Sequence, residues 1–430
     1  MGASQTSRLP YLTVAVCSIL VMSGAGPLDG QTPGQTPGQS EQSSDDIWRV
    51  VTERPANASP RTDITGPFAV VRLNKAAFDA RISQAPLESE PGRAGIMMTL
   101  PLPDGTFAQF RVVESPILAP ELAAEFPDIR TYHGQGIDDP TATARLGWTA
   151  AGFHAIVLSA AGTVYVDPYA AGDVEYYISF RKQDLQREQF ICLVESAERD
   201  ALERNLNQLP LTHGDTLRTY RLALAATGEY TAAAGGTKAL ALGRMTTTIN
   251  RVNGIYERDV AVRLTLITGT PGDATALIYT DGSTDPYTNN DGSVMLGENQ
   301  TNIDAVVGSA NYDIGHVFST GGGGIAATPS VCALSFKARG VTGLPSPTGD
   351  VFDVDFVAHE IGHQFSGDHT FNGTSLNCGG GTRSAANAFE VGSGSTILAY
   401  AGICSPEDLQ QNSHDYFHRG SLNQITDYIT

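Results

Sequence analysis

The stretch HEIGHQFSGDH, residues 359–369, determines how the rest of this chain is interpreted. His359 and His363 are four residues apart, so on a helix their side chains lie one turn apart on the same face. That spacing lets two imidazoles bind one Zn²⁺. His369 follows just beyond the helix and is the candidate third ligand. A chance cluster of helix histidines is the competing interpretation, and a third histidine at this distance argues against it.

Glu360 adds the chemistry that a metal site of this kind uses. Three neutral nitrogen ligands leave a fourth position for water, whose pKa zinc lowers toward about 7. Glu360 is adjacent to the first histidine, where it can take the proton as hydroxide attacks a peptide carbonyl. The stretch therefore predicts zinc-dependent peptide hydrolysis with Glu360 as general base.

The residues around this stretch have the pattern of an α/β domain with a mixed sheet. We expect residues 353–365 to form the helix that carries the first two histidines, with Asp353 near its N-terminus, where a carboxylate favours the helix dipole. Further helices are expected at 236–256 and 299–310. Strands are expected at 219–227, 260–268, 315–320 and 331–342, with a glycine-rich link, GGGGIA, at 321–326.

The N-terminal half is β-rich. Short runs separated by Gly, Pro, Asp and Asn occupy residues 48–205, and one short helix is expected at 120–125. His133 and His154 are single histidines in this region, and we interpret both as structural. The expected strands are 68–74, 95–102, 107–114, 144–150, 153–159, 162–169 and 174–180.

Composition and the N-terminus limit the partners. Among 430 residues, 46 acidic and 27 basic side chains give a formal net charge of −19, which repels nucleic acid and anionic membranes. Residues 1–25 have an early positive charge, a short apolar run and then small residues, the layout of a cleaved secretory signal. We expect a secreted protein without a membrane span after signal removal, with a membrane anchor as the alternative. Residues 26–47 are expected to be a flexible linker.

Several stretches resemble a known family of zinc enzymes. The zinc stretch resembles the extended signature of the metzincin metallopeptidases. Residues 220–430 are similar to the catalytic domain of the reprolysin-like (adamalysin-type) group, and to its secreted bacterial members in particular. The segments that carry this resemblance are RLALAATGEY, NRVNGIYERD, YDIGHVFSTGGGG, KARGVTG and AYAGIC.

The resemblance implies an organisation and a set of partners. It implies a metzincin-like α/β (α+β) catalytic domain, with a mixed twisted sheet and an active-site helix, at 206–430. A β-rich, propeptide-like domain is then expected at 48–205. Protein or peptide substrates follow from the resemblance. The polar residues near 209–215 would admit an activating protease, and a cut there is expected to release activity.

Two residues depart from the family pattern. Ser366 stands where the family has a glycine, and a non-glycine residue with positive φ costs roughly 1–2 kcal/mol. We expect Gly367 to take the turn instead. Leu398 stands where the family has a methionine beneath the metal. That methionine packs and does not bind the metal. A leucine in its place should therefore lower stability by under about 1.5 kcal/mol, and it is compatible with a working site.

Three features keep two interpretations each. Tyr400 matches the spacing of a zinc-linked tyrosine in some metzincins, such as the astacins, and is a candidate oxyanion stabiliser; a packed tyrosine is the alternative. GGGGIA resembles the family's edge strand beside the cleft, or is a plain hairpin loop. The acidic stretch 280–293 is a candidate Ca²⁺ segment, but it lacks the spaced ligands of an EF-hand, which favours a solvated loop. His316 is interpreted as structural.

Four cysteines remain after signal removal. Cys378 and Cys404 flank the segment between the third histidine and the turn under the metal, and we favour a disulfide between them. The resemblance pairs Cys332 with a cysteine close to where this chain stops at Thr430, so a fragment is expected. Cys192 is then either a thiolate at the fourth zinc position, which keeps the enzyme latent, or the disulfide partner of Cys332.

The leading hypothesis is a secreted zinc endopeptidase made as a zymogen. A catalytically inactive, metzincin-like zinc-binding interaction module is the alternative. The intact Glu360 argues against that alternative, whereas Ser366 and Leu398 leave it open. A wall-associated structural protein has only the β-rich half in its favour.

Overall fold

The computed structural model describes residues 42–53, 55, 63–186, 192–196, 216–347, 349, 351–379 and 381–430. The signal segment, most of the expected linker and the expected cleavage region at 209–215 lie outside the described residues. From Ser40 onward the chain forms one compact unit. None of the described helices is long and apolar enough to cross a membrane.

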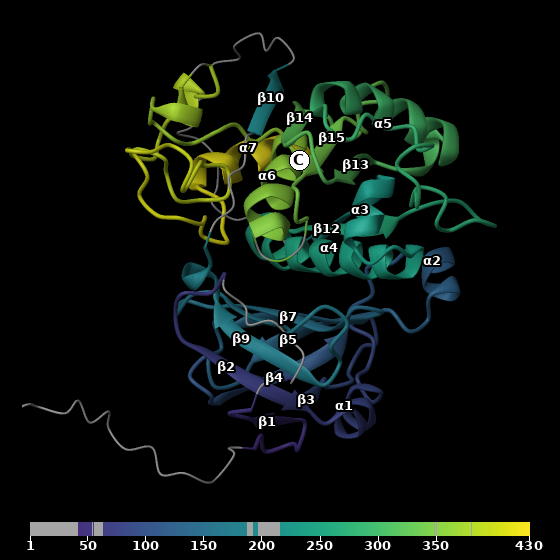
Figure 1. Ribbon diagram of the computed structural model, residues 1–430, viewed down its shortest axis with the longest axis vertical. Coiled ribbons are helices and arrows are strands. Elements are labelled where there is room, and N and C mark those ends of the chain that lie inside the picture. Colours follow the sequence, from purple (N-terminus) through teal and green to yellow (C-terminus); the bar gives the residue numbers. More distant parts are fainter. Residues whose placement is uncertain are drawn as a thin grey trace, which may run out of the picture. The chain divides into compact units, whose positions relative to one another are not determined.

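The N-terminal half of the described chain, referred to below as the β domain, is a nine-stranded antiparallel sheet (Figure 1). Trp48 Nε1 donates a hydrogen bond of 3.1 Å to Thr99 O, which brings the first strand to the last and nearly closes the sheet into a barrel. In spatial order the strands are β1 (Trp48–Val50), β2 (Phe68–Leu73), β9 (Tyr176–Arg181), β8 (Val164–Pro168), β7 (Gly152–Leu158), β6 (Thr143–Thr149), β5 (Arg130–Gly136), β4 (Phe107–Glu114) and β3 (Ile96–Pro101).

The seven expected strands of this domain are confirmed, and two more, β1 and β5, were missed. Strand β5, RTYHGQG, carries two glycines and several polar residues, so its sequence has no apolar alternation to detect. It pairs with β4 and β6 on both sides, and this long-range pairing makes it a strand. Helix α2 (Pro120–Glu125) lies where it was expected, and α1 (Lys75–Ile82) is an additional helix.

The second sheet has six strands of mixed direction, as expected. Its spatial order is β10 (Cys192–Ser196), β14 (Gly324–Thr328), β15 (Gly340–Gly343), β13 (Ile314–Ser319), β11 (Arg218–Ala226) and β12 (Val262–Ile267).

The expectation of one strand over 331–342 was wrong. Residues 331–339 form turns, and only Gly340–Gly343 is a strand. Lys337 is buried there, and its ammonium donates to the carbonyl of Tyr312 at 2.7 Å, a contact that an extended run does not provide. The last part of the expected glycine-rich link, from Gly324, is the beginning of strand β14 and not a loop.

Helices surround the second sheet. Helix α4 (Lys238–Val260) begins at Thr237, whose side chain accepts a hydrogen bond from Leu240 N, and it contacts β6 and β7 as well as β12. Helix α5 (Gly292–Val306) begins earlier than expected because the Asp291 side chain caps it. The remaining helices are α3 (Gly228–Ala233), α6 (His359–Gln364) and α7 (Arg419–Ile429).

The helix that carries the histidines has two parts. Residues Val351–Ala358 form a π-helix, and α6 continues from it as an α-helix. Asp353 is buried in the π-helix, where it accepts hydrogen bonds from Thr248 (2.6 Å) and Arg251 (2.8 Å). Asp353 lies in the first turn of this helix, as expected, and in addition forms a buried ion pair with α4.

Candidate metal centre

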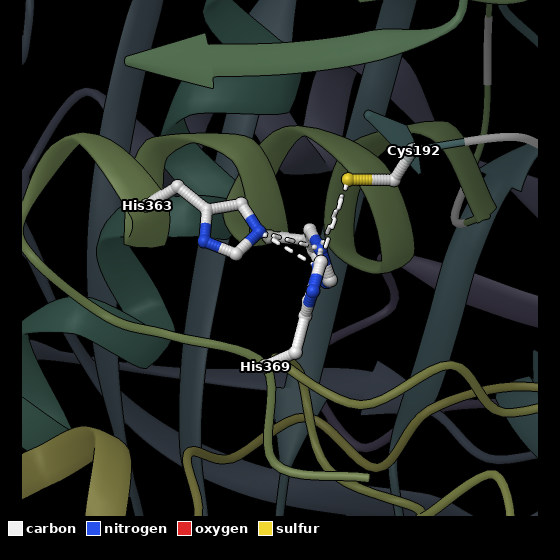
Figure 2. A group of neighbouring side chains, drawn as sticks. Cys192, His363 and His369 are labelled. Carbon is white, nitrogen blue, oxygen red and sulfur yellow. Dashed lines mark hydrogen bonds between the residues drawn. The ribbon is translucent and has the colours of Figure 1, made fainter. Parts of the chain in front are cut away.

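The three histidines of the zinc stretch meet at one point. The Nε2 atoms of His359 and His363 lie 3.0 Å apart, and His369 Nε2 lies 3.2 and 3.1 Å from them. Cys192 Sγ lies 3.5 Å from His359 Nε2 and 3.8 Å from His369 Nε2. Figure 2 shows the side chains of Cys192, His363 and His369 pointing toward one another. All four residues are buried.

Backbone carbonyls fix the tautomer of each histidine. The Nδ1 atoms of His359, His363 and His369 lie 2.6 to 2.7 Å from the carbonyls of Ile397, Gly367 and Thr382, respectively. Because a carbonyl only accepts, each Nδ1 carries the proton and each Nε2 of a neutral ring presents a lone pair. Burial, followed by the two neighbouring histidines, lowers the pKa of His369 well below its usual value, which favours the neutral ring.

Three lone pairs facing one another require a cation between them. Nitrogens about 2.0–2.1 Å from a tetrahedral zinc lie about 3.3 to 3.4 Å apart, and nitrogen and sulfur lie about 3.6 Å apart. The observed separations of 3.0 to 3.2 Å and 3.5 to 3.8 Å are close to these values. The residues therefore fit zinc, and they form a site of three histidines plus Cys192.

Glu360 lies beside this cluster and is fully buried. Neither of its carboxylate oxygens has a hydrogen-bond partner among the described residues. Burial raises the pKa of Glu360 to about 8, and a smaller effect of the neighbouring Cys192 thiol acts in the opposite direction. A carboxylate beside the metal cluster is placed to accept a proton from a reacting group and return it.

Cys192 reaches the cluster from the first residue of β10. This strand pairs in parallel with β14, with Cys192 opposite Gly324. The alternative pairing with Cys332 is wrong, because both cysteines are free and Cys332 is exposed. Burial and then the charge of Glu360 raise the pKa of Cys192 well above its usual value, so a thiolate here needs a cation beside it.

The turn after α6 differs from expectation. Ser366 itself has a φ of 82°, whereas Gly367 is not among the residues with positive φ. Gly367 is constrained by packing instead, since a Cβ built on it would lie 2.3 Å from Leu398 Cδ1. Leu398 is fully buried and contacts this turn, which confirms its role as apolar support below the histidines.

Of the other residues singled out from the sequence, Tyr400 packs against the metal cluster and His316 does not belong to it. The Tyr400 ring centroid lies 4.5 Å from that of His369, and its hydroxyl donates to Cys192 O at 3.0 Å. His316 is buried and bonded to Gln364 (2.9 Å) and Thr342 (2.8 Å), which confirms it as structural. In the β domain, His154 is bonded to Asp167, and neither His133 nor His154 belongs to the metal cluster.

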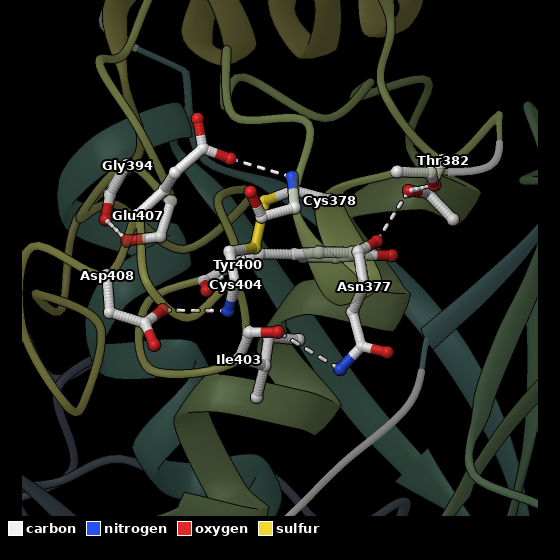
Figure 3. The surroundings of a disulfide bond; sticks show 12 residues. Asn377, Cys378, Thr382, Gly394, Tyr400, Ile403, Cys404, Glu407 and Asp408 are labelled. Carbon is white, nitrogen blue, oxygen red and sulfur yellow. Dashed lines mark hydrogen bonds between the residues drawn. A yellow bond between two sulfur atoms is a disulfide. The ribbon is translucent and has the colours of Figure 1, made fainter.

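The disulfide between Cys378 and Cys404 is confirmed (Figure 3). It connects the segment after the third histidine with the segment after Tyr400. Within the described chain, the histidines with Cys192 form the only group of His, Cys, Asp and Glu close enough to hold a metal ion. In the acidic stretch, Asp281 and Asp291 accept hydrogen bonds from nearby serines.

Glu390 supports the centre and was missed from the sequence. Its carboxylate accepts hydrogen bonds from the hydroxyls of Thr370 (2.6 Å) and Thr396 (2.5 Å). Thr370 follows the third histidine, and Thr396 precedes Ile397, whose carbonyl holds His359. Glu390 therefore joins the two segments that position these ligands. No local pattern marks it, because its partners are brought to it by the fold.

Comparison with known proteins agrees with this geometry. Residues 216–429 match the family model described as Metallo-peptidase family M12B Reprolysin-like. No curated protein matches the chain. Among solved structures, the crystal structure of metalloproteinase-II from Bacteroides fragilis is similar at 11% sequence identity and a TM-score of 0.44, covering 82% of this chain and 95% of that chain. The match over 216–429, with a complete set of zinc ligands inside it, places this chain in the reprolysin-like M12B family of metallopeptidases.

Proposed function

We propose that this metallopeptidase is a secreted zinc endopeptidase made as a latent precursor, with Cys192 as the blocking group. One observation carries the proposal, the position of Cys192 Sγ within 3.5 to 3.8 Å of two ligand nitrogens. A thiolate is a strong zinc ligand, and at this position it excludes the water that hydrolysis requires. Strand β10 also covers the edge of β14, where an extended peptide would pair its backbone.

The residues of the site then have separate roles. The three histidines would hold zinc, which would act as a Lewis acid toward a peptide carbonyl and a water molecule. Glu360 accepts the proton of that water and passes it to the leaving amine. Tyr400, once its hydroxyl is free of Cys192 O, donates a hydrogen bond to the oxyanion of the tetrahedral intermediate.

Secretion is supported by two features of the chain. Residues 1–25 have the layout of a cleaved export signal. The Cys378–Cys404 disulfide is of the kind that forms and persists in oxidising compartments. In an exported precursor, a second protease that cuts between the two domains is the expected activating partner.

A protease assay with zinc analysis tests this function. Protein freed of the β domain should hydrolyse casein, and a chelator should abolish the hydrolysis. Glu360→Gln should keep one zinc per chain while hydrolysis falls at least about 10²-fold, because the base is lost and the side-chain size is kept. Glu298→Gln, a change on α5 outside the centre, is the matched control and should behave like the parent. No hydrolysis by the protein freed of the β domain, despite bound zinc, would favour a zinc-binding interaction module.

A further inference from the structure

We infer that the β domain stays bound to the catalytic domain after the chain between them is cut, and continues to inhibit it. The inference rests on the proposed latency and concerns how latency ends. A cut alone does not release activity; the two pieces must also separate. The contacts between the N-terminal segments, through Ser196, and the residues from 216 onward are here called the junction.

The N-terminal segments pair with both edges of the catalytic sheet. At one edge, β10 pairs with β14 along its length. At the other edge, Leu266 of β12 donates to Ile117 O (2.7 Å) and accepts from Ala119 N (2.9 Å). Separation would therefore expose unpaired backbone groups on both outer strands of the catalytic domain, which is unfavourable and prone to re-pairing.

Lys182, which directly follows β9 of the β domain, has its ammonium group buried against residues of the catalytic domain. Its ammonium contacts the carboxylates of Asp355, at 2.7 Å, and Asp415, and all three residues are buried. Burial alone lowers the pKa of Lys182, but the two carboxylates outweigh it and the net pKa is raised. Removing Lys182 would take its positive charge away from two buried carboxylates, the costly way to break a buried ion pair.

Two more ion pairs cross the junction in opposite directions. Arg145 of β6 is buried against Glu257 of α4. Arg251 of α4 is buried and contacts Asp167 of β8 at 2.5 Å. Because each side supplies both cations and carboxylates, each half is matched to the other and to few other surfaces.

Close packing accompanies these charges. Two glycines of α4 let the β domain approach the helix: a Cβ on Gly243 would lie 3.0 Å from Thr149 Oγ1, and one on Gly254 would lie 3.0 Å from Arg145 Cγ. A single cluster of buried apolar side chains runs through both halves. The junction therefore resembles the interior of one domain, not a contact between two weakly associated ones.

These contacts do not depend on the peptide link. A cut after Ser196 leaves Cys192 on the β-domain piece, where the junction still holds it at the histidines. Buried ion pairs are little screened, so salt should not separate the pieces. An effective activator therefore also degrades or displaces the β domain.

The test uses the full chain with a site-specific protease sequence placed between Ser196 and Thr216. After complete cutting, the pieces should elute as one peak of the uncut mass at low salt and at about 1 M salt, with peptide hydrolysis no higher than before the cut. Lys182→Met should make the pieces separate at least about tenfold faster after cutting, with hydrolysis appearing in the catalytic peak. Arg72→Gln, which alters an exposed ion pair inside the β domain, is the matched control and should behave like the parent.

The outcomes separate this inference from the proposed function. Pieces of the cut parent that separate at once, with an active catalytic piece, would overturn the inference and leave the peptidase function intact. Pieces that stay together but hydrolyse substrate would overturn continued inhibition. A separated catalytic piece that holds zinc and is inactive would instead count against the peptidase function. The parent protein decides the result even if Lys182→Met does not fold.

Discussion

The hydroxyl of Tyr400 donates a hydrogen bond of 3.0 Å to the backbone carbonyl of Cys192, a residue 208 positions earlier in the chain. The contact joins the turn beneath the metal to the strand that delivers the thiol. The Tyr400 ring also lies against the His369 ring, with centroids 4.5 Å apart. The β10 strand therefore contacts both the metal site and the Tyr400 hydroxyl.

Replacement of Tyr400 tests that hydroxyl directly. In protein freed of the β domain, Tyr400→Phe should lower kcat about 10- to 100-fold and leave KM nearly unchanged, because a donor to the oxyanion acts in the transition state. Steady-state kinetics on a peptide substrate measures both constants. A kcat equal to that of the parent would assign Tyr400 a packing role only.

Cys192→Ala tests the part of the proposed latency that depends on the thiol. The variant should keep zinc on the three histidines and hydrolyse small peptides before any cut, since the fourth position becomes open to water. Cys332→Ala is the matched control, because Cys332 is also a free cysteine but is exposed and away from the metal. If Cys192→Ala remains as latent as the parent, the pairing of β10 with β14 accounts for the inhibition without the thiol.

Ser366→Gly should stabilise the protein. Ser366 has a φ of 82°, a conformation that costs a residue with a Cβ roughly 1 kcal/mol and costs glycine little. Urea unfolding should show a free energy of unfolding that is higher by about 1 kcal/mol in the variant than in the parent. Gly367→Ala is the counterpart and should destabilise, because its Cβ would collide with Leu398 Cδ1 at 2.3 Å. A loss of stability in Ser366→Gly would contradict this account of the turn.

Glu390→Gln should lower stability in a pH-dependent way. Burial raises the pKa of Glu390, but hydrogen bonds from Thr370 and Thr396 outweigh it, and the net pKa is lowered. A lowered pKa in the folded state stabilises the protein above the unfolded pKa, and this stabilisation is lost as pH falls through the folded pKa. The substitution should therefore lower the free energy of unfolding by about 2 kcal/mol at neutral pH, and by less below about pH 4. If the stability difference between Glu390→Gln and the parent does not change with pH, the loss comes from altered packing and not from the carboxylate charge.

The sequence predicts the ligand histidines because their spacing is local. His359 and His363 share a helix face by periodicity alone, and the β-rich and α/β halves follow from runs of a few residues. The disulfide was also predicted, since both cysteines flank one segment.

Features that depend on distant contacts could not be predicted. Ser366, and not Gly367, has positive φ, and Gly367 packs against Leu398, which lies 31 positions later. Strand β5 has no apolar alternation and forms because β4 and β6 pair with it. Lys182 looks like a surface lysine in the sequence, and only the fold brings two buried aspartates to it.

Zinc K-edge X-ray absorption on the uncut, full-length protein is the most direct test of the central claim. The account predicts one zinc per chain with three nitrogen neighbours and one sulfur neighbour, the latter absent in Cys192→Ala. After the β domain is removed, the sulfur should be replaced by a light atom while the three nitrogens remain. A sulfur-free zinc shell in the uncut protein, or zinc bound without the three histidines, would contradict the account.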